Sequence, residues 1–538
     1  MRIEELEIPA VEDRHFAYRF FEILPGAISW TILALSFIIA FFSVSASAFL
    51  MIAYLLMWFL KAVVLNIRVM QGFRTLHQHE KIDWQKLIDD AQAGKVTHVD
   101  APRWHEANLY RIAQKPNGIK PREVYHAIIV ATYNETREVL EPTLQAIKHS
   151  DFDPKKIILL LAYEERGGPA VEIQAKELMK EYGKVFGYAE AVKHPDGLPG
   201  EVRGKGGNIT YAGRRLKQIV AEKGLEPNHV LVTTLDSDNR PHPRYLAGLT
   251  YVYSVCGDPK HLSFQPVPMF TNNIWDAPAL MRVIAMSNSF WMLVQGLRQH
   301  MLRNFSAHAQ PLDALIDTDF WSTRTVVEDG HQFWRSYLRF DGRHEVIPIF
   351  LPIYQDAVLA KGYRRTLRAQ FIQIRRWAWG ASDIAYVLSN GFMKKNKIKK
   401  SDLTVKFLRL LEGHVSWATS PLLLMYGALV PRLFNSHNYL ANQLPLIASN
   451  IESIALATVL LSLYMSFKLL PPRPPRYKKS RMFWMAIQWA FLPVTTVCYS
   501  AAAAVNSQTR LMFKWYLGSF DVTEKAVKTE SGTVTSLK

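Results

Sequence analysis

Cysteine is scarce in this chain, whose 538 residues include only Cys256 and Cys498. Two cysteines cannot build a framework of several disulfides, and they also exclude a cysteine-rich zinc site. Their scarcity fits a reducing compartment. The length is enough for a full catalytic domain together with membrane segments.

Motifs for nucleic-acid binding and for ATP hydrolysis are also lacking. The chain has 64 Lys and Arg but only 47 Asp and Glu, so its net charge is +17. That charge suits an anionic membrane face, a phosphorylated substrate or nucleic acid. No basic and aromatic repeat or known module accompanies it, so nucleic acid is not expected as a partner. The P-loop spacing GxxxxGK, followed by Ser or Thr, is absent, and ATP hydrolysis is therefore not supported.

Long apolar runs, by contrast, lie towards both ends of the chain. The run at 23–65 is broken only by Lys61, and because one helix needs about 20 residues to cross a bilayer it predicts two crossings. The apolar part of a signal peptide is only about 7–15 residues long, which disfavours a cleaved signal peptide here. Basic residues at 68–81 place the following segment in the cytoplasm by the positive-inside rule.

A second membrane region is expected after residue 405. Residues 406–412 form a short amphipathic piece, and the apolar runs at 415–433 and 446–467 each predict a crossing. The loop at 468–481 is rich in Lys and Arg and has no acidic residue, so it is placed in the cytoplasm.

The last apolar run, at 482–505, has Pro493 near its middle. Proline breaks a helix and would leave two halves too short to span, so we expect a bent or re-entrant element, with a kinked crossing as the alternative. The predicted division is a cytosolic segment at 1–22, two transmembrane helices at 23–70, a cytosolic domain at 71–405, a membrane region at 406–505 and a cytosolic tail at 506–538.

The cytosolic domain alternates short strand-like runs with helical patterns. Residues 127–131, 157–162 and 229–235 are continuous apolar runs typical of buried parallel strands. Between the first two and after the second, 137–149 and 169–182 carry helical spacing. The pattern predicts an α/β domain with right-handed crossovers.

Polar residues follow the first two strands, where ligands of open parallel sheets bind. The first strand ends in Ala-Thr-Tyr-Asn-Glu, with Thr132, Tyr133 and Glu135, and a nucleotide is expected there. The second is followed by Glu164 and Glu165, and an acidic side chain here could accept from a base or a ribose. A surface turn would have the same composition, so both interpretations stay open.

Two further motifs suit a bound diphosphate. Residues 203–208 form a glycine-rich stretch that opens a helix, with Lys205 as its charge, although such a stretch is often only a turn. Asp236 and Asp238 follow the third strand with one residue between them. Hard oxygen ligands in this spacing can hold Mg²⁺ or Mn²⁺ against a diphosphate.

An acidic pair and an aromatic–basic motif complete the set. Glu328 and Asp329 precede a helical pattern. A carboxylate positioned there can remove the proton of an attacking hydroxyl. The alternative is that Asp329 only caps the helix. Gln373, Arg376 and Trp377 have the spacing QxxRW. A guanidinium grips phosphate, an indole offers a face to a sugar ring and an amide bonds hydroxyls.

The order ATYNE, GKGGN, DSD, VVEDG and QIRRW resembles the membrane-embedded processive glycosyltransferases of family 2, the cellulose, chitin and hyaluronan synthase group. Residues 520–525, FDVTEK, are also similar to FxVTxK, the gating-loop pattern of cellulose synthases. The resemblance implies a GT-A-like domain, a nucleotide-sugar donor and Mg²⁺ or Mn²⁺ as cofactor.

The same resemblance implies a role for each matching residue. In this assignment the donor is bound by Thr132, Tyr133, Glu135, Lys205, Asp236 and Arg376; the metal by Asp236 and Asp238; the acceptor by Trp377; Asp329 is the general base; and Phe520, Thr523 and Lys525 close over the nucleotide. From their own chemistry and place we add Glu164 to the donor-binding residues, and Gln373 and Glu328 to the acceptor-binding residues.

Departures from the family pattern limit the resemblance. The family usually has an Asp after the second strand, where this chain has Glu164 and Glu165. Residues 305–308, FSAH, match the FFCGS acceptor loop only loosely, and the WGTR pattern of chitin and hyaluronan synthases is absent. The roughly 13 residues after Lys525 are too few for further crossings or a cyclic-dinucleotide-binding barrel. A complete export channel in one chain is therefore not expected.

The sequence thus predicts an inverting hexosyltransferase that moves a sugar from a nucleotide-diphosphate sugar, with a UDP-sugar as the first expectation, onto a β-linked polysaccharide. It would be a multi-pass protein of the plasma (inner) membrane with a cytoplasmic catalytic domain, working with export subunits or as a homo-oligomer. One alternative is a single transfer to a polyprenyl-phosphate or other lipid acceptor. Another is a membrane receptor or transporter that binds nucleotides without chemistry.

Overall fold

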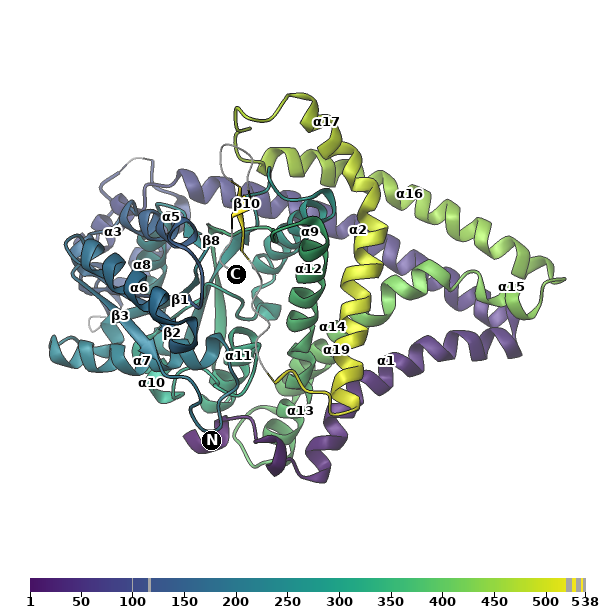
Figure 1. Cartoon of the computed structure of the whole chain (residues 1–538), viewed down its shortest axis with the longest axis horizontal. Helices are drawn as coiled ribbons and strands as arrows, with labels where there is room; N and C mark the ends of the chain where they lie inside the picture. The colour runs from purple at the N-terminus through teal and green to yellow at the C-terminus, as the bar shows by residue number, and fades with distance from the viewer. Residues whose placement is uncertain (99, 115–117, 519–524, 529–533, 536–538) are drawn as a thin grey trace.

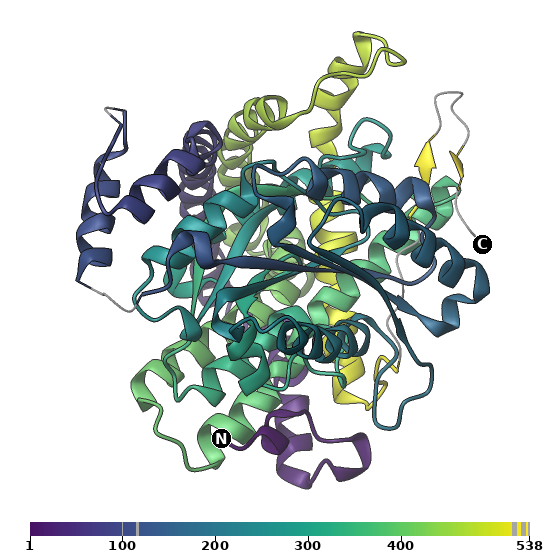
Figure 2. The same cartoon turned by 90° about the vertical axis from the view of Figure 1, so that its left-hand side faces the viewer.

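The computed structural model describes residues 1–98, 100–114, 118–518, 525–528 and 534–535. An α/β domain forms one side of the molecule, and long helices from both ends of the chain extend away from it (Figure 1). The N-terminal segment and the β9–β10 pair (Val527–Lys528 and Val534–Thr535) lie at opposite ends of this domain (Figure 2).

The domain is built on an eight-stranded sheet in the order β3-β2-β1-β4-β7-β6-β8-β5. The strands β1 to β4 that are neighbours pair in parallel, β7 is antiparallel to both β4 and β6, and β6 is parallel to β8. Six strands therefore run in one direction and end at one edge of the sheet. The bounds are β1 (Tyr125–Thr132), β2 (Ile157–Glu164), β3 (Tyr188–His194), β4 (Val230–Asp236), β5 (Arg240–Pro241), β6 (Leu262–Met269), β7 (Ala309–Pro311) and β8 (Glu345–Tyr354).

The three predicted strands are β1, β2 and β4, and the two predicted helices are α5 (Arg137–Lys148) and α6 (Pro169–Tyr182). The continuous apolar runs form central strands because both faces of the sheet are covered. Ile128 belongs to a core shared with α5, α6 and α8 (Tyr245–Val255), whereas Ile129 belongs to the core under α7 (Lys205–Glu222). The α/β class, inserted between two groups of apolar helices, is confirmed.

Further helices surround the sheet and line the side that faces the long apolar helices (Figure 1). α11 begins at the acidic pair, and α12 carries the QxxRW motif. α12 packs against α19, so this motif lies next to the C-terminal helices. The bounds are α3 (Trp84–Ala93), α4 (Arg103–Ala113), α9 (Ala279–Gly296), α10 (Leu312–Asp317), α11 (Glu328–Arg339), α12 (Tyr363–Ala378), α13 (Asp383–Val387) and α19 (Ala502–Met512).

Four helical stretches in the described part of the chain are long and apolar enough to span a membrane. They are α1 (Phe16–Phe42), α2 (Val44–Lys81), α16 (Tyr439–Leu469) and the run Ser480–Met512. α14 (Lys400–Tyr426) joins the predicted amphipathic piece and the start of the predicted crossing at 415–433 in one helix, which is not among these four. α15 (Val430–Phe434) follows it at the tip of the molecule (Figure 1).

The run Ser480–Met512 lies between the α/β domain and the other apolar helices, and crosses their direction (Figure 1). It consists of α17 (Ser480–Ile487), a 3₁₀ turn, α18 (Leu492–Thr495), a π-helical turn and α19. Pro493 stands in the first turn of α18, where its missing N–H leaves no helix bond unmade. Whether this run re-enters or crosses stays a prediction.

Candidate functional site

Several of the predicted site residues meet at the edge where the six co-directional strands end. Thr132, Glu164 and Asp236 are the last residues of β1, β2 and β4. Asp356 lies two residues beyond the end of β8, which reaches the same edge. The sheet thus brings together side chains that are far apart in the sequence, as is usual for ligand sites of open α/β sheets.

Lys205 is the central cation of this site. Its Nζ lies 3.0 Å from Asp236 Oδ1, 3.1 Å from Asp329 Oδ2 and 3.9 Å from Glu328 Oε1. Burial alone would lower the pKa of Lys205, but Asp236 and then Asp329 outweigh it and the pKa is raised. The ammonium therefore stays charged and ties the end of β4 to the start of α11.

Close packing of α7 against the segment that leads into α11 makes this contact possible. Gly206 is the second residue of α7, and a Cβ there would lie 2.3 Å from the carbonyl oxygen of Ser322. Only glycine fits at that distance. The predicted glycine-rich stretch thus lets the start of α7, with Lys205, approach the acidic pair.

The acidic pair opens α11, with Glu328 buried and Asp329 partly exposed. Burial and then the charge of Asp329 raise the pKa of Glu328, while Lys205 opposes them. Two carboxylates in one site that differ so in burial can take different roles. Asp329 is the one that can both reach solvent and contact Lys205.

Behind Asp329 lies His308, which is fully buried. The indole Nε1–H of Trp321 donates to His308 Nε2 over 3.2 Å, so the proton of the neutral ring must be on Nδ1. Nδ1 donates to the Phe305 carbonyl over 3.0 Å and lies 3.5 Å from Asp329 Oδ1. Burial lowers the pKa of His308, which keeps the ring neutral.

The loop that carries His308 also contacts the DSD motif. Ser306 donates from its hydroxyl to Asp236 Oδ2 over 2.7 Å. Ala307 adopts a left-handed backbone with φ of 67°, a conformation that costs a non-glycine residue energy. This loop is the FSAH stretch at 305–308, which matches the FFCGS acceptor-loop pattern only loosely.

Asp238 contacts a second lysine. Lys525 Nζ lies 2.8 Å from Asp238 Oδ1, 2.7 Å from Ser237 Oγ and 3.9 Å from Glu135 Oε1. The burial of Lys525 would lower its pKa, but Asp238 and then Glu135 outweigh it and the pKa is raised. Of the three residues predicted to close over the nucleotide, Phe520 and Thr523 lie outside the described residues.

Burial would raise the pKa of Asp236, but Lys205 and then Lys525 bring it well below its usual range. The pKa of Glu135 is lowered in the same way, by Lys525 against burial. Both carboxylates are therefore anionic at neutral pH and can face a cation.

The end of β1 is organised by Glu135. Its Oε2 accepts from the hydroxyl of Thr132 and from the backbone N–H of Tyr133, each over 2.8 Å. The guanidinium of Arg166 lies 4.2 Å from the centre of the Tyr133 ring and is paired with Glu164. The structure thus places Glu164, rather than Glu165, beside the residues predicted to bind a nucleotide.

The QxxRW motif lies on the last turns of α12. The Trp377 ring lies 6.2 Å from that of Phe270, the residue after β6, and Gln373 Oε1 accepts from Gln370 over 3.1 Å. Arg376 is close enough to lower the pKa of Glu328 electrostatically. Among the described residues, no hydrogen bond or ring contact joins Gln373 or Trp377 directly to the lysine–carboxylate cluster.

The possible metal ligands at this edge are oxygen atoms, namely those of the carboxylates and of the Ser237 hydroxyl. Such ligands suit a hard cation. Within the described ranges no three His, Cys, Asp or Glu side chains converge closely enough to hold a metal ion by themselves. Two carboxylates from the protein are sufficient for Mg²⁺ when substrate phosphates and water supply the other ligands. The predicted ligands Asp236 and Asp238 fit that description.

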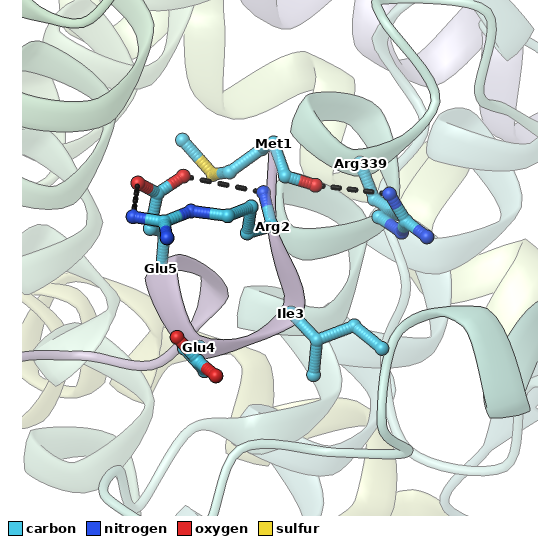
Figure 3. A pocket seen from close by; sticks show the side chains of 6 residues that line it. All are labelled: Met1, Arg2, Ile3, Glu4, Glu5 and Arg339. Atoms are coloured by element: carbon cyan, nitrogen blue, oxygen red, sulfur yellow. Dashed lines mark hydrogen bonds and ion pairs between the residues drawn. The ribbon is translucent and has the colours of Figure 1, made fainter.

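A separate hollow lies on the surface at the N-terminus. It has a volume of about 570 Å³ and is lined by residues 1–5 and Arg339 (Figure 3). Arg339 donates to the carbonyl of Met1 over 2.9 Å, and Arg2 is paired with Glu5. These contacts fix the start of the chain and involve none of the predicted site residues.

Sequence reasoning missed His308, Ser306 and Asp356 as parts of the site. The first two stand in the FSAH stretch, so weighing its polar residues individually would have found them. Asp356 had no signal beyond its place after a strand, because the direction of β8 was unknown.

Comparison with known proteins gives likenesses of structure only. No protein-family model and no curated protein sequence matches the chain. A mannosyltransferase from Pyrobaculum calidifontis in complex with GDP-Man and Mn²⁺ has a TM-score of 0.41 and 13% identity, over 82% of this chain and 98% of its own. TarS of S. aureus (1–349) with UDP-GlcNAc has a TM-score of 0.35 and 12% identity, over 77% of this chain and 97% of its own.

Proposed function

We propose that this chain is a membrane-bound inverting glycosyltransferase with a GT-A-like domain, related to the cellulose synthase group. The observation that carries the proposal is the contact of Lys205 with both Asp236 and Asp329. It joins a strand-end carboxylate suited to a diphosphate to a partly exposed carboxylate suited to a base. A protein that only bound an anion would gain nothing from a second carboxylate beside its ligand.

The donor is a sugar nucleotide, with a UDP-sugar as the first expectation. Thr132, Tyr133 and Glu135 hold the nucleoside at the end of β1, with Glu164 beside them. Lys205 and Arg376 contact the diphosphate. Asp236 and Asp238 would hold Mg²⁺ or Mn²⁺, which when bound would neutralise charge on the departing diphosphate.

The acceptor hydroxyl attacks the anomeric carbon from the face opposite the diphosphate, which inverts the configuration. A bond forms between the acceptor oxygen and that carbon, and the bond from the carbon to the diphosphate oxygen breaks with its electron pair. Asp329 takes the hydroxyl proton, and Arg376 stabilises the charge of the leaving diphosphate. Lys205 releases Asp329 as it turns to the diphosphate, so donor binding frees the base.

The acceptor is the end of a β-linked polysaccharide that rests on Trp377, with Gln373 and Glu328 bonding its hydroxyls. Stacking on an indole holds a sugar ring without fixing its identity. The active domain lies on the cytoplasmic side of the plasma membrane, and export takes further subunits or further copies of the chain. A single transfer to a polyprenyl-phosphate is the second candidate, since no long glycan channel is needed for it.

The test is to purify the protein in lipid and to offer a panel of UDP- and GDP-sugars with Mg²⁺ or Mn²⁺, with and without a chelator. We expect one donor to give released nucleotide and an equal amount of transferred sugar, with a polymeric product and no reaction in the chelator. A lipid-linked monosaccharide as the final product would establish the second candidate. Released nucleotide without any glycoside would contradict sugar transfer.

A further inference from the structure

Lys525 occupies an unusual position for a lysine side chain, because it reaches the DSD motif from the opposite end of the sequence. Its Nζ contacts Asp238 Oδ1 and Ser237 Oγ at 2.8 and 2.7 Å, and Glu135 lies 3.9 Å away. The backbone beside it is fixed too, since Ala526 N–H donates to the Leu359 carbonyl over 2.9 Å. The Lys525 ammonium is thus surrounded by hard oxygen atoms, as a bound metal ion would be.

Asp238 has one oxygen committed to the fold and one to Lys525. Its Oδ2 accepts from the backbone N–H of Asp356 over 3.0 Å. Oδ1 is the oxygen that faces the ammonium. A divalent ion that bound Asp238 through Oδ1 would have to displace the ammonium, since Oδ1 is the oxygen that Lys525 contacts.

Asp356 is the second carboxylate at this point. Its Oδ1 is buried and accepts no hydrogen bond from the described residues. A buried carboxylate oxygen without a partner is costly unless a cation faces it. The segment that carries Asp356 also carries Leu359, which anchors the backbone next to Lys525.

We propose that Asp238 and Asp356 together form the divalent-cation site of the sugar-nucleotide pocket. In this proposal the Lys525 ammonium occupies the cation site until the metal ion replaces it. The proposal rests on the proposed function for the identity of the ligand, a divalent ion carried with a sugar nucleotide. It adds a ligand, Asp356, and a competitor, Lys525, to the predicted pair Asp236 and Asp238.

The ion and the ammonium exclude one another for two reasons. Both compete for Asp238 Oδ1, and two positive charges at the separation of neighbouring ligands repel strongly in a partly buried site. Because the next residue, Ala526, is hydrogen-bonded to Leu359, release of Lys525 also disturbs this backbone contact. Metal loading and the position of the C-terminal segment are therefore one equilibrium.

The test measures binding of Mn²⁺ alone, by electron paramagnetic resonance of free Mn²⁺, to the full chain in lipid without any nucleotide. Lys525→Met removes the charge and keeps the length, and Lys217→Met on the exposed face of α7 removes a lysine charge elsewhere as the matched control. We expect Lys525→Met to bind Mn²⁺ at least tenfold more tightly than wild type, and the control to match wild type.

Asp356→Asn, made in the Lys525→Met background, is expected to lose at least tenfold of that affinity, while Asp341→Asn on the far turn after α11 loses none. Equal Mn²⁺ affinity in wild type and Lys525→Met would overturn the competition, and an unchanged affinity in Asp356→Asn would overturn the added ligand. Circular dichroism and melting of each variant identify one that fails to fold, in which case Asp356→Ser replaces it. Because Mn²⁺ binding needs no sugar and no turnover, these outcomes are separate from failure of the proposed transfer.

Discussion

Trp321 donates its indole N–H to Nε2 of His308 over 3.2 Å, and this single bond decides which nitrogen of the histidine carries the proton. The proton is directed towards the Phe305 carbonyl and the neighbouring Asp329. His308 touches neither donor nor acceptor in the proposed mechanism. It is a positioning residue, because its Nδ1 lies next to Oδ1 of the candidate base Asp329 and so orients that carboxylate.

We therefore expect His308→Asn to lower kcat about tenfold or more while the KM for the donor changes little, since only the orientation of the base is disturbed. Trp321→Phe, which loses the indole N–H but keeps the ring, should lower kcat less and should shift the acid limb of the pH–rate profile in the same direction as His308→Asn. Steady-state kinetics from pH 5 to 9 provide the readout. A uniform loss of activity with the profile unmoved would indicate a purely structural role.

Trp377 distinguishes polymerisation from single transfer. A processive enzyme must hold the growing end between additions, and the indole that packs near Phe270 offers the surface for it. Trp377→Ala is expected to shorten or abolish polymer while donor binding stays within about threefold of wild type, because Arg376 and the carboxylates remain. Trp377→Phe should retain part of the chain length. Product sizing decides, and polymer of wild-type length from Trp377→Ala would remove the residue from the acceptor site.

The chain contacts the α/β domain both before and after the run Ser480–Met512. Arg476, before it, pairs with Asp276 over 2.8 Å, and Lys525, after it, contacts Asp238. A helix that crossed the bilayer once would separate these two ends, so we expect it to lie at or dip into the membrane face and return. Single cysteines at Lys478 and Lys514 should both react with an impermeant maleimide only from the cytoplasmic side. Labelling of Lys514→Cys from outside would establish a full crossing.

Buried histidines make the domain sensitive to acid. Burial lowers the pKa of His126 on β1 to about 3, whereas an unfolded histidine titrates near 6.5. Between these values the unfolded chain binds a proton that the folded chain does not, so stability is lost as the pH falls. His126→Gln should reduce the fall in Tm between pH 7.5 and 5, even though its Tm at pH 7.5 is lower. An identical fall in both proteins would contradict the assignment.

Much of the fold could be predicted because its signals are local. The apolar runs of β1, β2 and β4 are continuous, since helices cover both faces of the sheet. The start of α7 at Lys205 and of α11 at Glu328 follow from the glycine-rich stretch and the acidic pair. These features require only neighbours in the sequence.

The site could be predicted only at positions where a local sequence motif indicates it. That Lys205 joins Asp236 to Asp329 depends on β4 and α11 meeting in space, about 90 residues apart in the sequence. His308 acquires its role from Trp321, and Asp356 from the direction of β8 and from its backbone bond to Asp238. Such pairings are tertiary, and no pattern within one stretch of the chain specifies them.

The central claim is that Asp329 removes a proton during sugar transfer, and a single turnover tests it most directly. Enzyme in excess is mixed with the labelled donor identified by the panel, Mn²⁺ and acceptor, and nucleotide and glycoside are followed together in wild type, Asp329→Asn and, as a surface control, Asp319→Asn. We predict equal amounts of free nucleotide and β-linked product from wild type and the control. Asp329→Asn should bind the donor normally but form product about 10²–10⁴-fold more slowly. Product formation by Asp329→Asn at the wild-type rate, or bound donor that wild type leaves unchanged, would contradict the account.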